Sequence, residues 1–216
     1  MADYDLEIDT APLADAELDV VSRAELKEHL RMFAAGVTTY DNILDDCIRD
    51  AVGDLHGQMG ELNRTVMPTT WKRHWKKFPT DKTGDEKRSL WLPFPPVTSV
   101  TSVQYRDTDG ATQTVSSSDY ILIAGNQSAR VQLLPSVDWP DTEEHPRAVT
   151  VTYVAGYTAY PSTMKRLVKI MAGHKFENLE ATNNEPRAIV VNRRVDFGHD
   201  YLVKLLKVQL PYGDDR

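Results

Sequence analysis

The stretch at residues 92–110 decides the fold, and it reads Leu-Pro-Phe-Pro-Pro-Val-Thr-Ser-Val-Thr-Ser-Val-Gln-Tyr-Arg-Asp-Thr-Asp-Gly. Three prolines stiffen its entry, and the next residues alternate as in an extended strand. The two faces of that strand are expected to carry Val97, Ser99, Thr101, Val103 and Tyr105 on one side, and Val100, Ser102 and Gln104 on the other. The Asp107–Gly110 segment then reverses the chain, because Asp-Gly readily supplies the positive φ angles of tight hairpins. The stretch therefore predicts an antiparallel hairpin, with residues 112–115 as its returning strand.

Further short strands are predicted on both sides of this hairpin. Residues 65–78 favour a strand over a helix, because they contain Pro68, the Thr69-Thr70 pair and several aromatic residues. The other candidate strands are separated by glycine and proline, and they lie near 89–93, 98–106, 111–116, 119–123, 129–134 and 148–154. Short strands at this spacing are typical of an antiparallel sheet or a small sandwich.

Helices are predicted before and after the strands. Ser22–Glu25 has the pattern of a capping box, which begins a short helix. A second helix is expected from near Thr39 to about Leu55, and a long one from Pro161 to about Glu180. The fold class is therefore α+β, with an N-terminal helical pair, a central antiparallel β-sheet or small sandwich, a long helix in the C-terminal half and an extended C-terminal arm.

The charge of −7 is unevenly spread along the 216 residues. Residues 1–19 hold seven acidic residues and no Lys or Arg, whereas the remaining chain has 25 acidic and 25 basic residues. We interpret residues 1–19 as an acidic N-terminal arm, residues 20–180 as one domain, and residues 181–216 as a C-terminal arm with a short helix. The acidic arm is either a solvated, disordered tail or a segment that orders against a basic surface of a partner.

Composition limits the classes of protein that this chain can be. Its length allows burial of about two-thirds of the unfolded surface, so a core needs no covalent staples. The single cysteine, Cys47, excludes an intramolecular disulfide and suits a reducing compartment. No apolar run approaches the roughly 20 residues of a membrane span. We expect a soluble protein, made in the cytoplasm, that has no membrane partner.

The sequence contains none of the common catalytic motifs, such as a phosphate-binding glycine loop, a nucleophile elbow or a zinc-binding His pair on a helix. Its six histidines lie on separate segments without metal-ligand spacing. Cys47 falls on the apolar stripe of the second helix, where a small buried side chain is expected. We therefore predict no catalytic, cofactor-binding or metal site.

Two charged segments remain as candidate contact surfaces. Asp46, Asp50 and Asp54 recur once per turn on the second helix, as a solvated face or as an interface. One helix face supplies too few converging oxygens for a cation. The segment 71–78 mixes Lys72, Arg73, Lys76 and Lys77 with aromatic residues, a pattern that fits weak nucleic-acid backbone contact or, alternatively, core and interface anchors.

Several pieces of the chain, in order, are similar to one known family. Residues 21–31 resemble an opening helix of the form A-E-x-K-x-H-L-R, and Asn63-Arg64, Thr70-Trp71 and Phe78-Pro79 resemble a G-R…T-W…F-P link in which asparagine replaces glycine. The 92–110 block follows, and the remaining pieces are Trp139-Pro140, Val149–Tyr157 and His174–Asn178. Together they cover most of residues 20–180 and resemble the head–tail connector (adaptor) proteins of tailed bacteriophages. Residues 1–19 and 181–216 depart from the family pattern.

The resemblance implies a structural protein of the virion rather than an enzyme. Connectors of this family form a ring, commonly of twelve copies, beneath the portal protein, where they extend the DNA channel toward a stopper or tail-completion protein. Packaged DNA would pass through without sequence readout. A closed ring needs two different complementary faces on each copy, for which the acids Asp46, Asp50 and Asp54 and the cations Lys72, Arg73, Lys76 and Lys77 are our candidates.

The C-terminal arm is the candidate contact with the portal or with a neighbouring copy. The residues expected to make it are Arg193, Arg194, Tyr201, Leu202, Leu205 and Leu206. Two other function classes stay open. One is a nucleic-acid-binding or other binding module that uses residues 71–78, and the other is a small hydrolase that would have to gather His174, Glu177 and an aspartate in one pocket.

Overall fold

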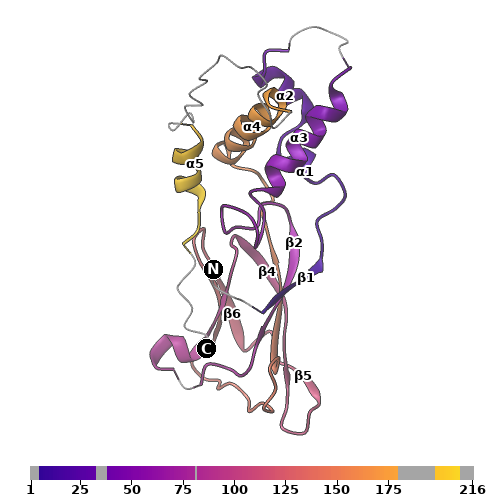
Figure 1. The fold of residues 1–216 in the computed structure, drawn as a ribbon. Helices are drawn as coiled ribbons and strands as arrows, with labels where there is room; N and C mark the ends of the chain where they lie inside the picture. Colours follow the sequence, from indigo (N-terminus) through magenta and orange to yellow (C-terminus); the bar gives the residue numbers. More distant parts are fainter. Residues whose placement is uncertain (1–4, 33–37, 81, 180–197, 210–216) are drawn as a thin grey trace, which may run out of the picture. The chain divides into compact units, whose positions relative to one another are not determined.

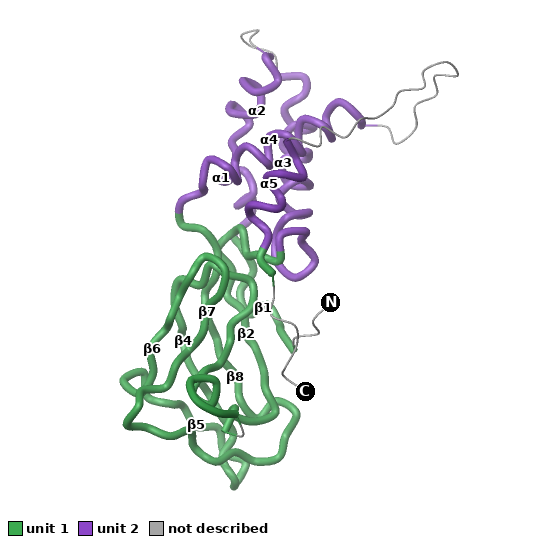
Figure 2. The backbone as a smooth tube through the Cα atoms, turned by 90° about the vertical axis from the view of Figure 1, so that its left-hand side faces the viewer, with its two compact units in different colours: residues 1–12, 63–158, 208–216 green, residues 13–62, 159–207 purple. Residues whose placement is uncertain are grey.

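The computed structural model describes residues 5–32, 38–80, 82–179 and 198–209. The chain divides into two compact units, which Figure 2 colours separately. Unit 1 comprises residues 1–12, 63–158 and 208–216, and unit 2 comprises residues 13–62 and 159–207. The described strands lie in unit 1 and the α-helices in unit 2, which confirms the α+β class. We had expected a single domain over residues 20–180 from the distribution of charge and the family resemblance. That range includes parts of both units.

Unit 1 contains two antiparallel sheets (Figure 1). The larger has the strand order β1-β2-β8-β4-β5, with bounds Leu6–Thr10, Thr69–Trp75, Val149–Ala155, Val97–Arg106 and Thr112–Thr114. The smaller has the order β3-β7-β6, with bounds Ser89–Leu92, Ala129–Leu133 and Tyr120–Ala124. A 3-10 helix, η1 (Gly84–Arg88), precedes β3. Every strand predicted between residues 65 and 154 overlaps an observed one, whereas β1 was not predicted.

The two sheets share one hydrophobic core. Its buried residues come from both sheets and include Trp71, Leu90, Val103, Val131, Val151 and Tyr153. Phe78 and Trp139 extend the core beyond the strands, with their rings stacked 4.4 Å apart between centroids. Unit 1 is therefore a small sandwich, held mainly by apolar burial between its sheets.

The strict alternation predicted for the 97–105 strand is wrong in its middle. The pairing of β4 with β8 shifts register between Val97 and Ser99 and again between Val100 and Ser102. Each bulge adds a residue and turns the following side chains to the other face. As a result Val97 and Val103 are buried and Val100 packs against the core, while Ser99 and Thr101 are exposed.

The proline-rich entry to β4 is tied to neighbouring backbone. The Tyr153 hydroxyl donates to the Pro93 carbonyl at 3.1 Å, and the Gly156 amide donates to the Pro96 carbonyl at 2.8 Å. Gly156 has φ of 124°, and a Cβ at this position would lie 2.5 Å from the Met67 carbonyl oxygen. The turn after β8 therefore requires glycine, both for its dihedral angles and for the close approach.

Unit 2 contains five helices in the described residues. Their bounds are Glu17–Val20 for α1, Arg23–His29 for α2, Asp41–Gly53 for α3, Ser162–Glu177 for α4 and His199–Leu206 for α5. The predicted capping box is confirmed, since the Glu25 amide donates to Ser22 Oγ at 3.3 Å and the Ser22 amide donates to Glu25 Oε2 at 2.9 Å. α3 packs against α1, α2 and α4, and α5 packs against α4. Cys47 is buried among these helices as predicted, and burial raises the pKa of its thiol.

Candidate assembly surfaces

Residues 5–19 of the acidic N-terminal arm are ordered, so the interpretation as a disordered tail is wrong for them. β1 pairs antiparallel with β2, and its acids meet cations of the same unit. Arg147 binds Asp5 through two bonds of 2.7 and 2.8 Å, and Lys72 Nζ lies 2.6 Å from Asp9. Glu7 faces both Arg147 and His74, at 3.4 Å from each. The arm thus orders against a basic surface, as the second interpretation expected, but that surface belongs to its own chain.

The aromatic residues of segment 71–78 belong mostly to the core. Trp71 and Phe78 are only 3% and 1% exposed, and the Trp71 indole donates to Thr65 Oγ1. Trp75 lies beneath the Arg73 guanidinium, 4.4 Å from the ring centroid. Trp71 and Phe78 therefore offer no face on which a base could stack. The hypothesis of a nucleic-acid module that uses this segment loses two of its three aromatic residues.

The cations of the same segment are used differently from what we expected. Arg73 is 3% exposed and donates to the Trp91 carbonyl, so it is part of the interior of unit 1 and is removed from the candidate interface. Lys72 is held by Asp9, whereas Lys76 and Lys77 are exposed. Period-2 alternation was the available signal for Arg73, because it places this residue on the same strand face as Trp71.

The acids of α3 are exposed, although two of them have partners within unit 2. Asp46 pairs with Arg49 at 2.9 Å, and Asp54 pairs with Lys175 at 2.9 Å. Asp50 is exposed as well. Asp46, Asp54 and Lys72 therefore already have partners within this chain, so they are not left free for a neighbouring copy.

A set of ion pairs joins α2 to α3, and it was not predicted from the sequence. Arg23 binds Asp41 at 2.8 Å and also Asp45, and Lys27 binds Asp41 at 2.5 Å. The hydrogen bond from Lys27 lowers the pKa of Asp41, and the hydrogen bond from Arg23 lowers the pKa of Asp45. The sequence did contain a signal for these ion pairs, because Arg23 and Lys27 on one helix, and Asp41 and Asp45 on the next, are each four residues apart. These charges are paired with one another within unit 2, so they are not candidates for a partner.

The C-terminal helix α5 has one buried and one exposed apolar face. Leu202 and Leu206 are 4% and 7% exposed and pack within unit 2, so they are removed from the candidate contact. Tyr201 and Leu205 are 62% and 51% exposed, and their i, i+4 spacing places them side by side. Arg193 and Arg194 lie outside the described residues. The candidate contact is therefore reduced to Tyr201 and Leu205 in the described part of the chain.

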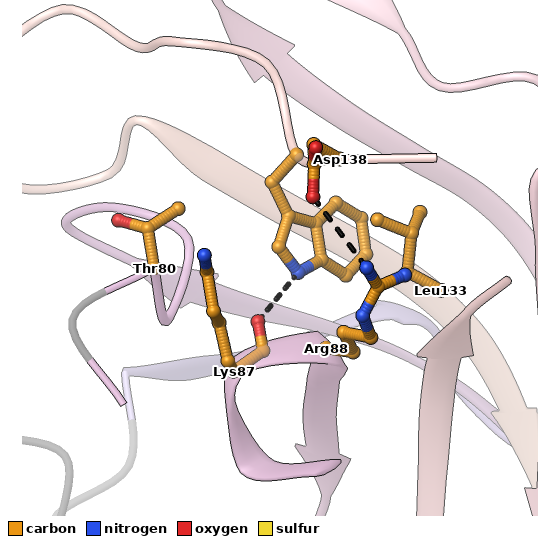
Figure 3. Close-up of a pocket in the computed structure, with 6 residues that line it drawn as sticks. Thr80, Lys87, Arg88, Leu133 and Asp138 are labelled. Carbon is orange, nitrogen blue, oxygen red and sulfur yellow. Dashed lines mark hydrogen bonds and ion pairs between the residues drawn. The ribbon is translucent and has the colours of Figure 1, made fainter. Parts of the chain in front are cut away.

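A small hollow in unit 1 has a structural rather than a ligand-binding character. Figure 3 shows its lining, where the Trp139 indole donates to the Lys87 carbonyl at 3.1 Å and Arg88 lies 3.6 Å from Asp138. Arg88 also donates to the Leu134 and Val137 carbonyls. Its volume of about 160 Å³ is below the range of small-molecule sites. Neither His174 nor Glu177 lines it, so the hydrolase hypothesis finds no support there.

Among residues 5–32, 38–80, 82–179 and 198–209, no three His, Cys, Asp or Glu side chains come together as metal ligands would. Within the same ranges no helix combines the length and apolar character needed to cross a membrane.

Comparison with known proteins identifies the fold. No family model matches the sequence, and no curated protein matches it significantly. Several solved chains have a similar fold. Three of the structures that contain them are described as the neck of an empty gene transfer agent (GTA) particle computed with C6 symmetry, the virion of a native GTA particle, and the neck of a native GTA particle computed with C12 symmetry.

The likeness to these structures extends over the full length of both chains. TM-scores are 0.68, 0.67 and 0.65, with 19%, 18% and 19% identity, and each match covers 98% of this chain and 99% of the other. At this identity the likeness is one of fold. Both units of this chain, the sandwich and the helices, thus recur together in chains of GTA particles.

Proposed function

We propose that this chain is a structural, non-catalytic component of the neck of a phage-like particle. Copies of it form a ring beneath the portal protein, extend the DNA channel, and join the head to a stopper or tail-completion protein. The observation that carries the proposal is the whole-length likeness of fold to chains of GTA particles, two of whose structures are described as necks. The connector-like motifs along residues 20–180 support it independently.

A ring of twelve copies accounts best for the symmetry of the similar structures. One neck was computed with C12 symmetry and another with C6, and a twelve-fold ring is compatible with both. Packaged DNA would pass through such a ring without sequence readout. We place the assembled protein in the virion.

The exposed acids of α3 and the exposed lysines after β2 are the proposed pair of ring faces. A head-to-tail ring joins two different surfaces of each copy, and opposite charges on them favour the correct register. Asp46, Asp50 and Asp54 form the acidic side, to which Asp46 and Asp54 contribute only if they leave Arg49 and Lys175. The exposed lysines Lys76 and Lys77 form the basic side, and Lys72 beside them is paired with Asp9.

The exposed face of α5 is the proposed contact with the portal or with a neighbouring copy. Tyr201 and Leu205 together form a small apolar patch on the surface of unit 2. Such a pair of side chains can insert into an apolar groove of a partner, because helix faces dock through anchors spaced by one turn.

The experiment removes this patch without touching the core. The wild-type gene is deleted in the cells that produce the particles, and the double variant Tyr201→Ser/Leu205→Ser is expressed in them from a second copy. Electron microscopy then counts the heads that are joined to tails. The proposal predicts tailless heads. Met59→Ser is the matched control, since Met59 is 87% exposed and its loss should leave joining intact. Truncation after Glu185 is less informative, because it also removes the buried Leu202 and Leu206.

The outcomes separate the contact from the function. If the gene deletion itself leaves heads and tails joined, the neck assignment is wrong. If the deletion blocks joining and the α5 double variant restores it fully, only the assignment of α5 as the contact is wrong.

A further inference from the structure

The N-terminal strand β1 is attached to its sheet in an unusual way. Only Leu6 packs against the core of unit 1, while residues 7–10 are exposed, and Ile8 is 52% exposed. The strand is held by its backbone ladder to β2 and by the acids that meet Arg147, His74 and Lys72. Because few apolar side chains are buried, β1 can leave the edge of the sheet without opening the core.

The chain also separates β1 from the strand with which it pairs. After β1 the chain enters unit 2 at Leu13 and returns to unit 1 only at Asn63, shortly before β2 begins at Thr69. No short hairpin therefore ties β1 to β2. The edge of β2 recognises a strand of this sequence, whichever copy of the chain supplies it.

The segment between β1 and α1 has features of a hinge. Pro12 stiffens it, and Asp15 has φ of 61°, a left-handed turn conformation that aspartate adopts more readily than most residues. Leu13 is 85% exposed and has no apolar cover within its unit. Asp15 is held by Arg49 at 2.7 Å, so the residues that can change direction are those between β1 and Asp15. A short segment of this kind can carry a strand either to its own sheet or to the sheet of a neighbouring copy.

We infer that β1 is exchanged between neighbouring copies in the assembled ring, so that β1 of one copy completes the five-stranded sheet of the next. The inference rests on the ring proposed above. Exchange keeps every backbone and charge contact of β1, because the receiving sheet is identical, and only the hinge changes. The ring supplies neighbours at high effective concentration, and the exchanged strands would lock adjacent copies together.

The test uses cysteines at Thr10 and Thr70, which are direct partners in the β1–β2 register. Neither side chain has an ion pair or hydrogen bond in the described part of the chain, so both can be replaced without breaking the charge contacts. The native Cys47 is buried and should not compete. One preparation carries Thr10→Cys and a size tag, the other carries Thr70→Cys without a tag, and both are assembled together into neck rings.

Oxidation followed by a non-reducing denaturing gel gives the readout. Exchange predicts a band at the summed mass of one tagged and one untagged chain, present in rings and absent from a mixture of free monomers. The double variant Thr10→Cys/Thr70→Cys is the control, and as a free monomer it should form an intrachain bond without a change in mass. If the control bonds within the chain and assembled rings give no mixed band, the exchange is refuted.

Two other outcomes are also decisive. If the control forms no bond in the free monomer, the β1–β2 pairing itself is wrong and the inference fails with it. If this chain is not recovered in necks at all, the proposed function fails. If the chain is present in necks but β1 stays in its own copy, only the exchange is overturned.

Discussion

Strands β1 and β8 flank the same strand, β2, and are held there by different forces. β8 places Val149, Val151, Tyr153 and Ala155 in the core, all of them fully buried. β1 places four of its five residues at the surface and relies on charges that water also solvates. The difference separates the parts of unit 1 that determine stability from a part that can be rearranged during assembly.

The largest expected effect is at the centre of β8. Tyr153→Ala should lower the free energy of unfolding of unit 1 by about 3–5 kcal/mol, because it empties a core site and removes the bond to Pro93. Ile8→Ala on β1 should cost less than about 1 kcal/mol, because that side chain is half exposed. Urea unfolding followed by tryptophan fluorescence measures both, since all four tryptophans lie in unit 1. Equal losses would remove the distinction between the two strands.

The end of β8 should be nearly as sensitive. Gly156→Ala introduces a Cβ within 2.5 Å of the Met67 carbonyl oxygen at positive φ, and should destabilise unit 1 by about 2–3 kcal/mol. Gly53→Ala in α3 is the control, because a Cβ there meets nothing within 4 Å and alanine favours the helix by up to about 1 kcal/mol. A neutral Gly156→Ala variant would show that the turn after β8 is not tightly fitted.

The next largest effect is a pH dependence of stability that comes from the buried side chain of His56. It contrasts with the charges of β1, which are exposed. Burial lowers the pKa of His56 in unit 2 to about 4, below its unfolded value near 6.5. The folded state therefore favours neutral His56, and its contribution is present above pH 6.5 and lost as the pH falls toward 4. Between pH 7 and pH 5 the loss should be about 2 kcal/mol.

His56→Gln is the variant that isolates this contribution. Urea unfolding followed by far-ultraviolet circular dichroism reports the helices of unit 2 at each pH. The wild-type protein should lose stability between pH 7 and pH 5, in a window above the ordinary titration of carboxylates, and the variant should lose much less. Parallel pH profiles would mean that His56 is accessible to protons in the folded state.

The smallest expected effect is on β1 itself. Arg147→Gln removes the partner of Asp5 and Glu7, and should raise hydrogen exchange of the β1 amides about two- to five-fold, with β8 unchanged. High salt should produce a similar change in the wild-type protein, because it screens exposed charges. If exchange in β8 rises as much as in β1, the two strands open together and β1 is not a separate element.

The sequence predicted best the elements whose signals are local. Strand positions from 65 to 154 follow alternation and turn residues, and the capping box at Ser22 follows from two side chains three residues apart. The bulges in β4 were missed because they depend on how β8 pairs with it, which neither strand shows alone. The partners of the acidic arm were missed for a similar reason, since Arg147 is distant in sequence and charge complementarity does not specify which cation is used.

The candidate assembly residues were only partly predictable. Arg73 was assigned to an interface because its charge was counted without its strand face, although alternation puts it beside Trp71. On α5, spacing identified an apolar helix, but only packing against α4 shows that Leu202 and Leu206 are inside while Tyr201 and Leu205 are outside. Which exposed residues meet a partner depends on that partner, and the sequence of one chain does not contain it.

A symmetry-averaged cryo-electron microscopy map of the particle that carries this protein tests the neck assignment most directly. The expected result is a closed ring of twelve copies on the tail axis between the portal and the tail, with the sandwich and helices α1 to α5 of each copy resolved in density. A map that places this chain away from the portal axis, or in isolated copies on the head surface, would contradict it.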